Sequence, residues 1–210
     1  MRAAALLLFI ALQISAKDLK YWIEPRAGGD PQLAQWALEA WERVSHGSLH
    51  FVPTNARDEA LLRVLWVTGP NGLYGEARPI IVNGQRGAEL YVRPEMDGLG
   101  PDIEAAASKD RLLRDAIVYL TCLHESGHGL GLPHTSAFED IMYSFGYGGD
   151  INEYFGRYRH KLSSRDDIRK NSGISSADEQ HLRELFSPPP PRRVDRPADP
   201  VAVPKSIAVR

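Results

Sequence analysis

A fixed spacing of three histidines and one glutamate constrains this chain more than any other feature of its 210 residues. The segment 124–134 has the form His-Glu-x-x-His-x-x-Gly-x-x-His. On a helix, His124 and His128 are four residues apart and project from one face, with Glu125 beside them. If the chain turns back afterwards, His134 reaches the same point. The spacing predicts that three neutral imidazoles bind one zinc ion.

The residues after His128 favour a sharp end to this helix. Gly129 and Gly131 tolerate backbone angles that other residues avoid, and Pro133 cannot continue a helix. We therefore expect the chain to reverse and to bring His134 to the metal. Three protein ligands leave a fourth position open, which is typical of a catalytic rather than a structural zinc site. The alternative is a set of ordinary core histidines.

A second feature downstream favours the metal site. Met142 follows His134 by eight residues, within the short apolar segment 140–143, and Ser144 comes next. This arrangement resembles the Met-turn that lies under the zinc in the metzincin clan of zinc peptidases. The chain is most similar to the matrixins, the matrix-metalloproteinase-like family, because Thr135 follows the third histidine and Tyr143 follows the methionine.

The resemblance extends over most of residues 19–187. Segments 30–44, 75–77 and 176–179 occur in the order that a matrixin catalytic domain would have them. The resemblance implies an α+β fold of metzincin type. Its parts would be a twisted mixed β-sheet with a backing helix, an active-site helix, the Met-turn and a C-terminal helix.

Three departures from the matrixin pattern narrow what can be carried over. No Pro-Arg-Cys-Gly segment precedes the domain, so we expect activity without removal of a cysteine switch. The loop before Glu89 lacks the His and Asp cluster that holds a structural zinc and calcium in vertebrate matrixins. We therefore expect one catalytic Zn²⁺, and calcium is not supported by the sequence. Ser144 stands where matrixins have Pro, so the resemblance does not define the wall of the specificity pocket. Ser144 also stands where astacins and serralysins have a Tyr that approaches the metal, so no tyrosine switch at the zinc is expected.

Composition indicates one exported domain. Residues 1–16 contain Arg2, an apolar run and a small-residue end, the three parts of a secretory signal peptide. The expected location is therefore secreted and extracellular, or periplasmic in a bacterium; the alternative is a buried N-terminal helix. Cys122 is the single cysteine, which excludes an internal disulfide. A formal net charge of −2 gives no case for nucleic acid. We expect a monomer without a stable membrane anchor.

The resemblance implies a metzincin/matrixin-like catalytic domain at 17–187, and the Pro-rich composition of residues 188–210 predicts a disordered tail. Alternation around Tyr21 predicts a first strand, and Asp30 with Pro31 predicts the start of a helix. The active-site helix should begin near Asp110. Further strands are expected at 49–51, at 61–67 as a central strand, at the edge segment 75–77, and at 89–93.

The region after the Met-turn predicts three more helices. Asp150 with Glu153 starts one, a short one follows Ser164, and Ser176 with Glu179 would cap the last. In matrixins this region wraps the pocket for the residue after the cleaved bond. The alternative is a solvated helical insert whose basic residues simply face water. Those basic residues are Arg157, Arg159, Lys161, Arg165 and Arg169.

The resulting hypothesis is a secreted zinc-dependent endopeptidase. Zinc would polarise a water and the peptide carbonyl, with Glu125 as the general base. Residues Gly75, Glu76 and Ala77 would offer backbone groups to an extended peptide or protein substrate. Met142 would form an apolar floor without binding the metal. Two alternatives remain: a catalytically silent metzincin-fold binding module, against which the intact Glu125 argues, and a zinc hydrolase of a non-peptide amide.

Overall fold

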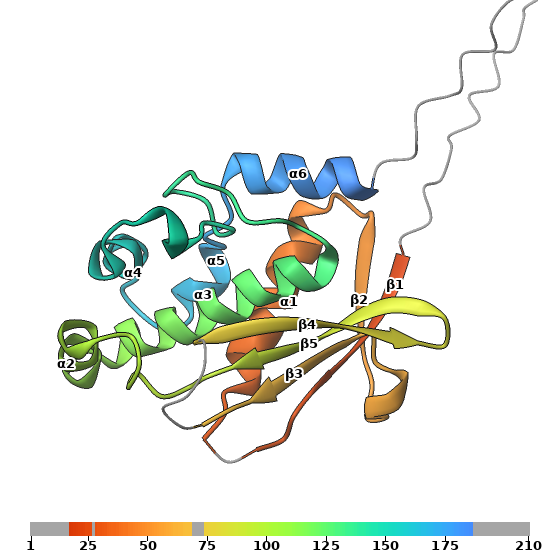
Figure 1. Cartoon of the computed structure of the whole chain (residues 1–210), viewed down its shortest axis with the longest axis horizontal. Coiled ribbons are helices and arrows are strands. Elements are labelled where there is room, and N and C mark those ends of the chain that lie inside the picture. The colour runs from red at the N-terminus through yellow and green to blue at the C-terminus, as the bar shows by residue number, and fades with distance from the viewer. Residues whose placement is uncertain (1–16, 27, 69–73, 187–210) are drawn as a thin grey trace, which may run out of the picture.

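The computed structural model describes residues 17–26, 28–68 and 74–186. The expected signal peptide at 1–16 and the expected tail at 188–210 lie outside this part of the chain. The described residues form the expected α+β fold, a five-stranded mixed sheet with several helices (Figure 1). No helix among them is long and apolar enough to cross a membrane.

The sheet has the strand order β2-β1-β3-β5-β4. All neighbours are parallel except β4, which is antiparallel to β5. The predicted central strand is confirmed as β3, and the segment 75–77 begins β4 at the sheet edge. Strand β5 starts four residues before the predicted boundary. Its first residues, exposed Gln85 and Arg86 and then buried Gly87 and Ala88, do not alternate between apolar and polar, so the sequence pattern does not reveal them. The bounds are β1 Lys17–Ile23, β2 Leu49–Pro53, β3 Leu62–Trp66, β4 Gly75–Val82 and β5 Gln85–Val92.

Two long helices, α1 (Pro31–Val44) and α3 (Arg111–Leu130), pack against each other and place the metal-binding motif over the sheet (Figure 1). Both begin at the predicted aspartates. Asp30 accepts a hydrogen bond from the amide of the third helical residue, and Asp110 accepts two such bonds. The indole of Trp41 donates to the carbonyl of Leu123 at 2.9 Å and to Ser126 at 3.1 Å. The buried face of α1 therefore anchors the end of α3 that carries the histidines.

The sequence pattern missed helix α2 (Pro101–Lys109), because it buries only Ile103 and Ala107 and so shows little periodicity. The cap of α6 (Ser176–Phe186) lies one residue earlier than predicted. Ser175 accepts from the amide of Asp178 at 3.0 Å, and the Asp178 carboxylate accepts from the amide of Ser175 at 3.2 Å. This reciprocal pair is a capping box in which Asp178 takes the place expected for Glu179.

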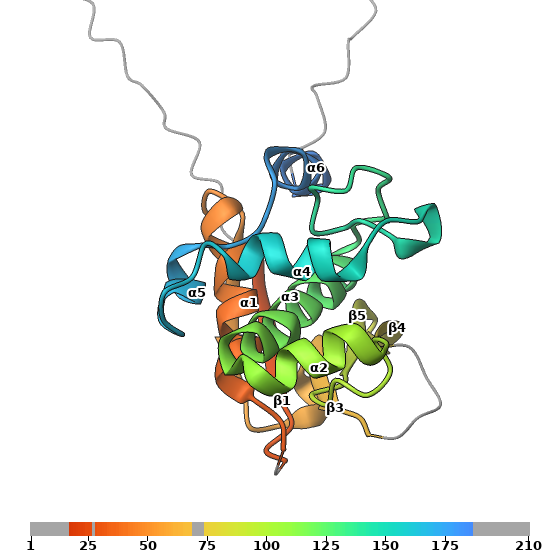
Figure 2. The same ribbon diagram turned by 90° about the vertical axis from the view of Figure 1, so that its left-hand side faces the viewer.

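Helices α4 (Ile151–Arg159) and α5 (Asp167–Lys170) confirm two of the predicted helices; α4 packs against α3, and α5 packs against α1 (Figure 2). Two basic residues of this region do not simply face water. Arg159 pairs with Asp110 at 2.7 Å, and Arg165 pairs with Asp30 at 2.6 Å and with Asp115 at 2.7 Å. Two of these carboxylates are helix caps. The insert is therefore fastened to the helices that carry the site.

Replacing Arg165 with Gln should destabilise the domain, because Asp115 is mostly buried and would lose its cationic partner. Loss of charged hydrogen bonds of this kind costs roughly 1–3 kcal/mol of unfolding free energy. Urea titration followed by circular dichroism measures the change. The control is Lys161→Gln, which removes an exposed charge nearby and should alter stability by less than about 0.5 kcal/mol. Equal stabilities for the two variants would contradict the fastening role of Arg165.

Candidate metal centre

The last two turns of α3 carry His124, Glu125 and His128. The helix continues through Gly129 and ends at Leu130, so the expectation that Gly129 supplies the exit was wrong. Gly129 is helical and lies against side chains of the sheet. Of these two glycines, it is Gly131 that adopts the left-handed conformation, with φ of 106°, and its amide donates to helix carbonyls. A residue without a Cβ is needed there, and it reverses the chain toward the third histidine.

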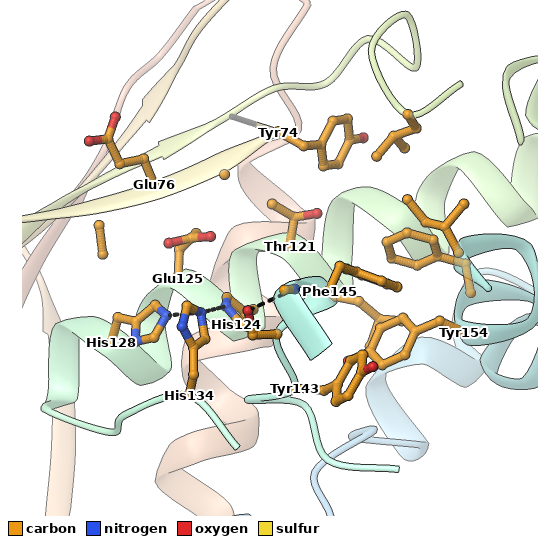
Figure 3. Close-up of a pocket in the computed structure, with 18 residues that line it drawn as sticks. Tyr74, Glu76, Thr121, His124, Glu125, His128, His134, Tyr143, Phe145 and Tyr154 are labelled. Atoms are coloured by element: carbon orange, nitrogen blue, oxygen red, sulfur yellow. Dashed lines mark hydrogen bonds between the residues drawn. The ribbon is translucent and has the colours of Figure 1, made fainter. Parts of the chain in front are cut away.

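The structure brings all three histidines of the motif together (Figure 3). One nitrogen from each ring lies within 4.8 Å of the others. The Nε2 atom of His134 is 3.2 Å from Nε2 of His124 and 3.0 Å from Nε2 of His128. Three ring nitrogens from two separate segments therefore face one point.

The opposite ring nitrogens show which atoms carry hydrogen. Nδ1 of His124 is 2.6 Å from the carbonyl oxygen of Ile141, and Nδ1 of His128 is 2.8 Å from that of Leu132. A carbonyl oxygen only accepts, so both Nδ1 atoms are donors. In neutral rings, the Nε2 atoms then present lone pairs to the shared point. Nε2 of His134 carries one hydrogen at most, so it cannot donate a separate hydrogen to each of the other two Nε2 atoms, and nitrogen lone pairs are left facing one another.

A zinc ion fits this arrangement. Four-coordinate zinc binds imidazole nitrogen at about 2.0–2.1 Å, and tetrahedral geometry then separates two ligand nitrogens by about 3.3 Å. The observed separations of 3.0 and 3.2 Å are close to that value. The carbonyl partners of the Nδ1 atoms are also those that commonly orient metal-binding imidazoles. His124, His128 and His134 are therefore the residues that would hold the ion.

Burial sets the charge of the groups at this centre. It lowers the pKa of His124 to about 4 and lowers that of His134, so both rings are neutral and able to bind a metal at pH 7. Burial, helped by the nearby charge of Glu76, raises the pKa of Glu125 to about 8. A divalent cation beside this carboxyl would favour its ionised form. Glu125 lies between the three histidines and the strand that carries Glu76 (Figure 3).

Met142 lies under the site, with its sulfur against Gly127 where any side chain would collide. Its backbone carbonyl accepts from the amide of Thr135 at 2.9 Å, and the amide of Ser144 donates back to Thr135 at 3.2 Å. The residue after the third histidine is thus joined directly to the Met-turn. Met142 is buried, and its role as an apolar floor stays a prediction from the sequence.

The sequence reasoning did not identify the carboxylates that support this turn. Asp178, which is fully buried, accepts from the amide of Ile141 at 2.7 Å. The hydroxyl of Ser175 lies 2.9 Å from Asp178 and 2.6 Å from buried Asp140. The Ser-x-x-Asp spacing of 175–178 is a capping signal, but it gave no hint that Asp178 also binds the Met-turn. Burial raises the pKa of Asp178.

A cleft of about 480 Å³ runs over the histidines, along the edge strand β4. Gly75, Glu76 and Ala77, the predicted substrate-binding residues, line one side of it. Gly75 has a further role, since a Cβ there would collide with the Glu125 carboxylate and lie 2.7 Å from Thr121. Glu76 pairs with Arg78 at 2.7 Å on the surface.

One end of the cleft is apolar and largely aromatic (Figure 3). The hydroxyls of its tyrosines bond to other protein groups, so their rings face the cavity as apolar surface. Tyr143 donates to Gly148, Tyr154 donates to Asp140, and Tyr74 contacts a methionine sulfur. Helix α4 and the short turn η2 (Phe145–Tyr147) supply much of this wall. The apolar residues of this end are Tyr74, Leu99, Leu120, Tyr143, Phe145, Ile151, Tyr154 and Phe155.

Purified protein should contain about one zinc per chain, because the described residues hold one group of three or more metal-binding side chains. His134→Ala should lower the zinc content, whereas His160→Ala, an exposed histidine outside the cluster, should not. Inductively coupled plasma mass spectrometry after dialysis measures the ratio. Wild-type zinc in the His134 variant would exclude this residue as a ligand.

Gly75→Ala should reduce catalysis while leaving zinc in place, because its methyl group would displace the Glu125 carboxylate and no metal ligand. Misplacement of a catalytic group by about 1 Å can cost up to about 10²-fold in rate. Gly156→Ala is the matched control, since a Cβ at this helical glycine meets open space. Zinc content and turnover are measured on both variants. Unchanged turnover in Gly75→Ala would show that this contact does not position Glu125.

Comparison with known proteins gives one similar curated sequence and a set of structural likenesses. No protein-family model matches the chain. Macrophage metalloelastase of Oryctolagus cuniculus is 26% identical over 150 residues, which are 70% of this chain and 29% of the relative. The chain thus spans less than a third of that protein. Archaemetzincin from Methanopyrus kandleri, a solved structure, aligns with a TM-score of 0.42 and 17% identity over 84% of this chain and 99% of its own.

The metalloelastase likeness and the three-histidine cluster are the two findings from which a function can be proposed, and the assignment to the metzincin clan stays a prediction from the sequence. The narrower assignment to the matrixins is a prediction of the same kind.

Proposed function

We propose that this chain is a zinc-dependent endopeptidase. The observation that carries the proposal is the convergence of three imidazole nitrogens beside one buried carboxylate, at the floor of a cleft that follows a sheet edge. The 26% identity to a metalloelastase supports the same chemistry. Export through the segment 1–16 is part of the proposal and rests on the sequence alone.

The chemistry divides between the ion and the chain. Zinc, when bound, supplies a Lewis acid that polarises water and a peptide carbonyl. The carboxylate of Glu125 accepts the proton of the attacking water and delivers it to the leaving amine. Trp41 holds the helix that carries Glu125, and Gly75 leaves the space that its carboxylate occupies. Direct attack by water requires no covalent intermediate with the protein.

The edge strand supports an extended substrate. Among the described strands, β4 pairs only with β5, so its other edge can pair with a peptide backbone beside the histidines. An antiparallel peptide would run opposite to β4, from Pro79 toward Gly75. Its residues after the cleaved bond then reach the apolar end of the cleft near Tyr74 and Tyr154. We therefore propose peptides with a large apolar residue directly after the cleaved bond as substrates.

This geometry favours a peptidase over the two alternatives. A silent binding module has no need for a buried carboxylate at the open side of the metal site. A small non-peptide amide would leave most of the strand edge and the aromatic wall without contacts. Both alternatives make different predictions when Glu125 is changed and peptides are offered.

Glu125→Gln keeps the size of the side chain but removes the base. Zinc content should remain at the wild-type level, and peptide hydrolysis should fall by about 10²- to 10⁴-fold, the usual cost of losing a general base. Hydrolysis of a denatured-protein substrate is followed by mass spectrometry, with and without a chelator. Loss of zinc in the variant would make Glu125 a ligand or structural anchor. Absence of zinc-dependent hydrolysis in the wild type would favour the binding module.

A further inference from the structure

A second groove, of about 420 Å³, opens beyond the other end of the metal cleft. It lies where the start of β1 and the end of α6 meet at one corner of the molecule (Figure 1). Ala77 and His128 line both cavities, so the groove continues the cleft along β4 toward Pro79. A peptide that pairs with β4 would reach the mouth of this groove at Ala77 and Pro79, from where the groove crosses the sheet past β5 and β3 to the start of β1.

The floor of the groove is apolar. Leu19, Leu61, Leu62 and Ala88 are buried residues of the sheet region that line it. Leu185 lines the rim and is 51% exposed, so it adds apolar surface there. The cavity is large enough for a branched aliphatic or aromatic side chain.

The rim is positively charged. Lys17 and Arg86 both line the groove and are exposed. Neither forms an ion pair within the described ranges 17–26, 28–68 and 74–186. Other cations near the sheet, such as Lys20 and Arg78, are already paired with glutamates. Two cations without partners beside an apolar floor complement a ligand that has an apolar side chain and a nearby carboxylate.

We propose that this groove binds the substrate segment before the cleaved bond. It would select a segment in which an acidic residue lies on the N-terminal side of an apolar residue. The proposal rests on the proposed peptidase function, because the antiparallel pairing with β4 sets the direction. Strand residues rise by about 3.4 Å each and alternate in direction, so the apolar side chain lies about two to four residues before the bond. Beyond that side chain the peptide must leave the strand edge to follow the groove, and a carboxylate further upstream then meets Arg86 on β5 and Lys17 on β1.

The test uses zinc-loaded wild-type protein, the double variant Lys17→Glu/Arg86→Glu, and Lys161→Glu as a charge-reversal control away from the groove. A peptide library from a denatured proteome is digested, and the cleaved sites are identified by mass spectrometry. Wild type and control should share an acidic preference upstream of an apolar residue. The double variant should lose that preference and keep the apolar preference directly after the bond. For one synthetic peptide with upstream Asp, kcat/KM should fall about three- to tenfold.

Binding is measured separately from turnover. A fluorescein-labelled peptide with the sequence Asp-Glu-Leu-Leu-Gly-Leu, and a partner with Lys-Lys in place of Asp-Glu, are titrated into the Glu125→Gln protein by fluorescence anisotropy. The acidic peptide should bind more tightly, and the added Lys17→Glu/Arg86→Glu changes should remove or reverse the difference. Leu185→Ser should weaken both peptides, because it removes apolar surface from the rim.

The outcomes separate the two proposals. Cleavage of the library without any upstream preference, or equal binding of the two peptides, would overturn the groove assignment and leave the peptidase intact. Absence of cleavage would refute the peptidase, and the substrate role of the groove would fall with it. If a protein ending at Ser187 binds the acidic peptide much more tightly than the full chain, the natural occupant is the segment 188–210, and the substrate assignment is wrong.

Discussion

Two hydrogen bonds from histidine Nδ1 atoms to backbone carbonyls determine the chemistry of this protein. They connect His124 to Ile141 and His128 to Leu132, and they turn both Nε2 lone pairs toward His134. Each carbonyl belongs to a loop rather than to α3 itself, so the site forms only when those loops are correctly folded. The reversal at Gly131 and the bridge between Thr135 and Tyr143 supply that order.

Other helices hold the loops and the helix end that carry these histidines. Asp178 on α6 holds the amide of Ile141, whose carbonyl orients His124, so the last helix acts on the metal centre through one residue. On the other side, Trp41 of α1 binds the carbonyl of Leu123, next to the first histidine. Ion pairs of Arg165 then fasten the region that forms the aromatic wall. Contacts from α1 and α6 therefore meet at the end of α3 that carries the histidines.

Local signals predicted most of the fold and the centre of the site. The spacing of His124, Glu125, His128 and His134 predicted a shared point, and the capping aspartates predicted where helices begin. The signals failed where the relevant contact joins distant segments. Nothing local to Asp178 indicates that it binds the Met-turn, and the periodicity of α2 is weak because only two of its residues are buried. The groove at Lys17 and Arg86 is likewise formed by residues from segments far apart in the sequence, so no local pattern indicates it.

The central claim is that three imidazoles, and not Glu125, hold one zinc ion. A crystal structure of the zinc-loaded protein, with anomalous diffraction data collected on both sides of the zinc absorption edge, tests this claim most directly. The account predicts one strong anomalous peak at about 2.0–2.1 Å from Nε2 of His124, His128 and His134, with the Glu125 carboxylate outside the coordination shell. A peak bonded to Glu125, or one that leaves out His134, would contradict the account.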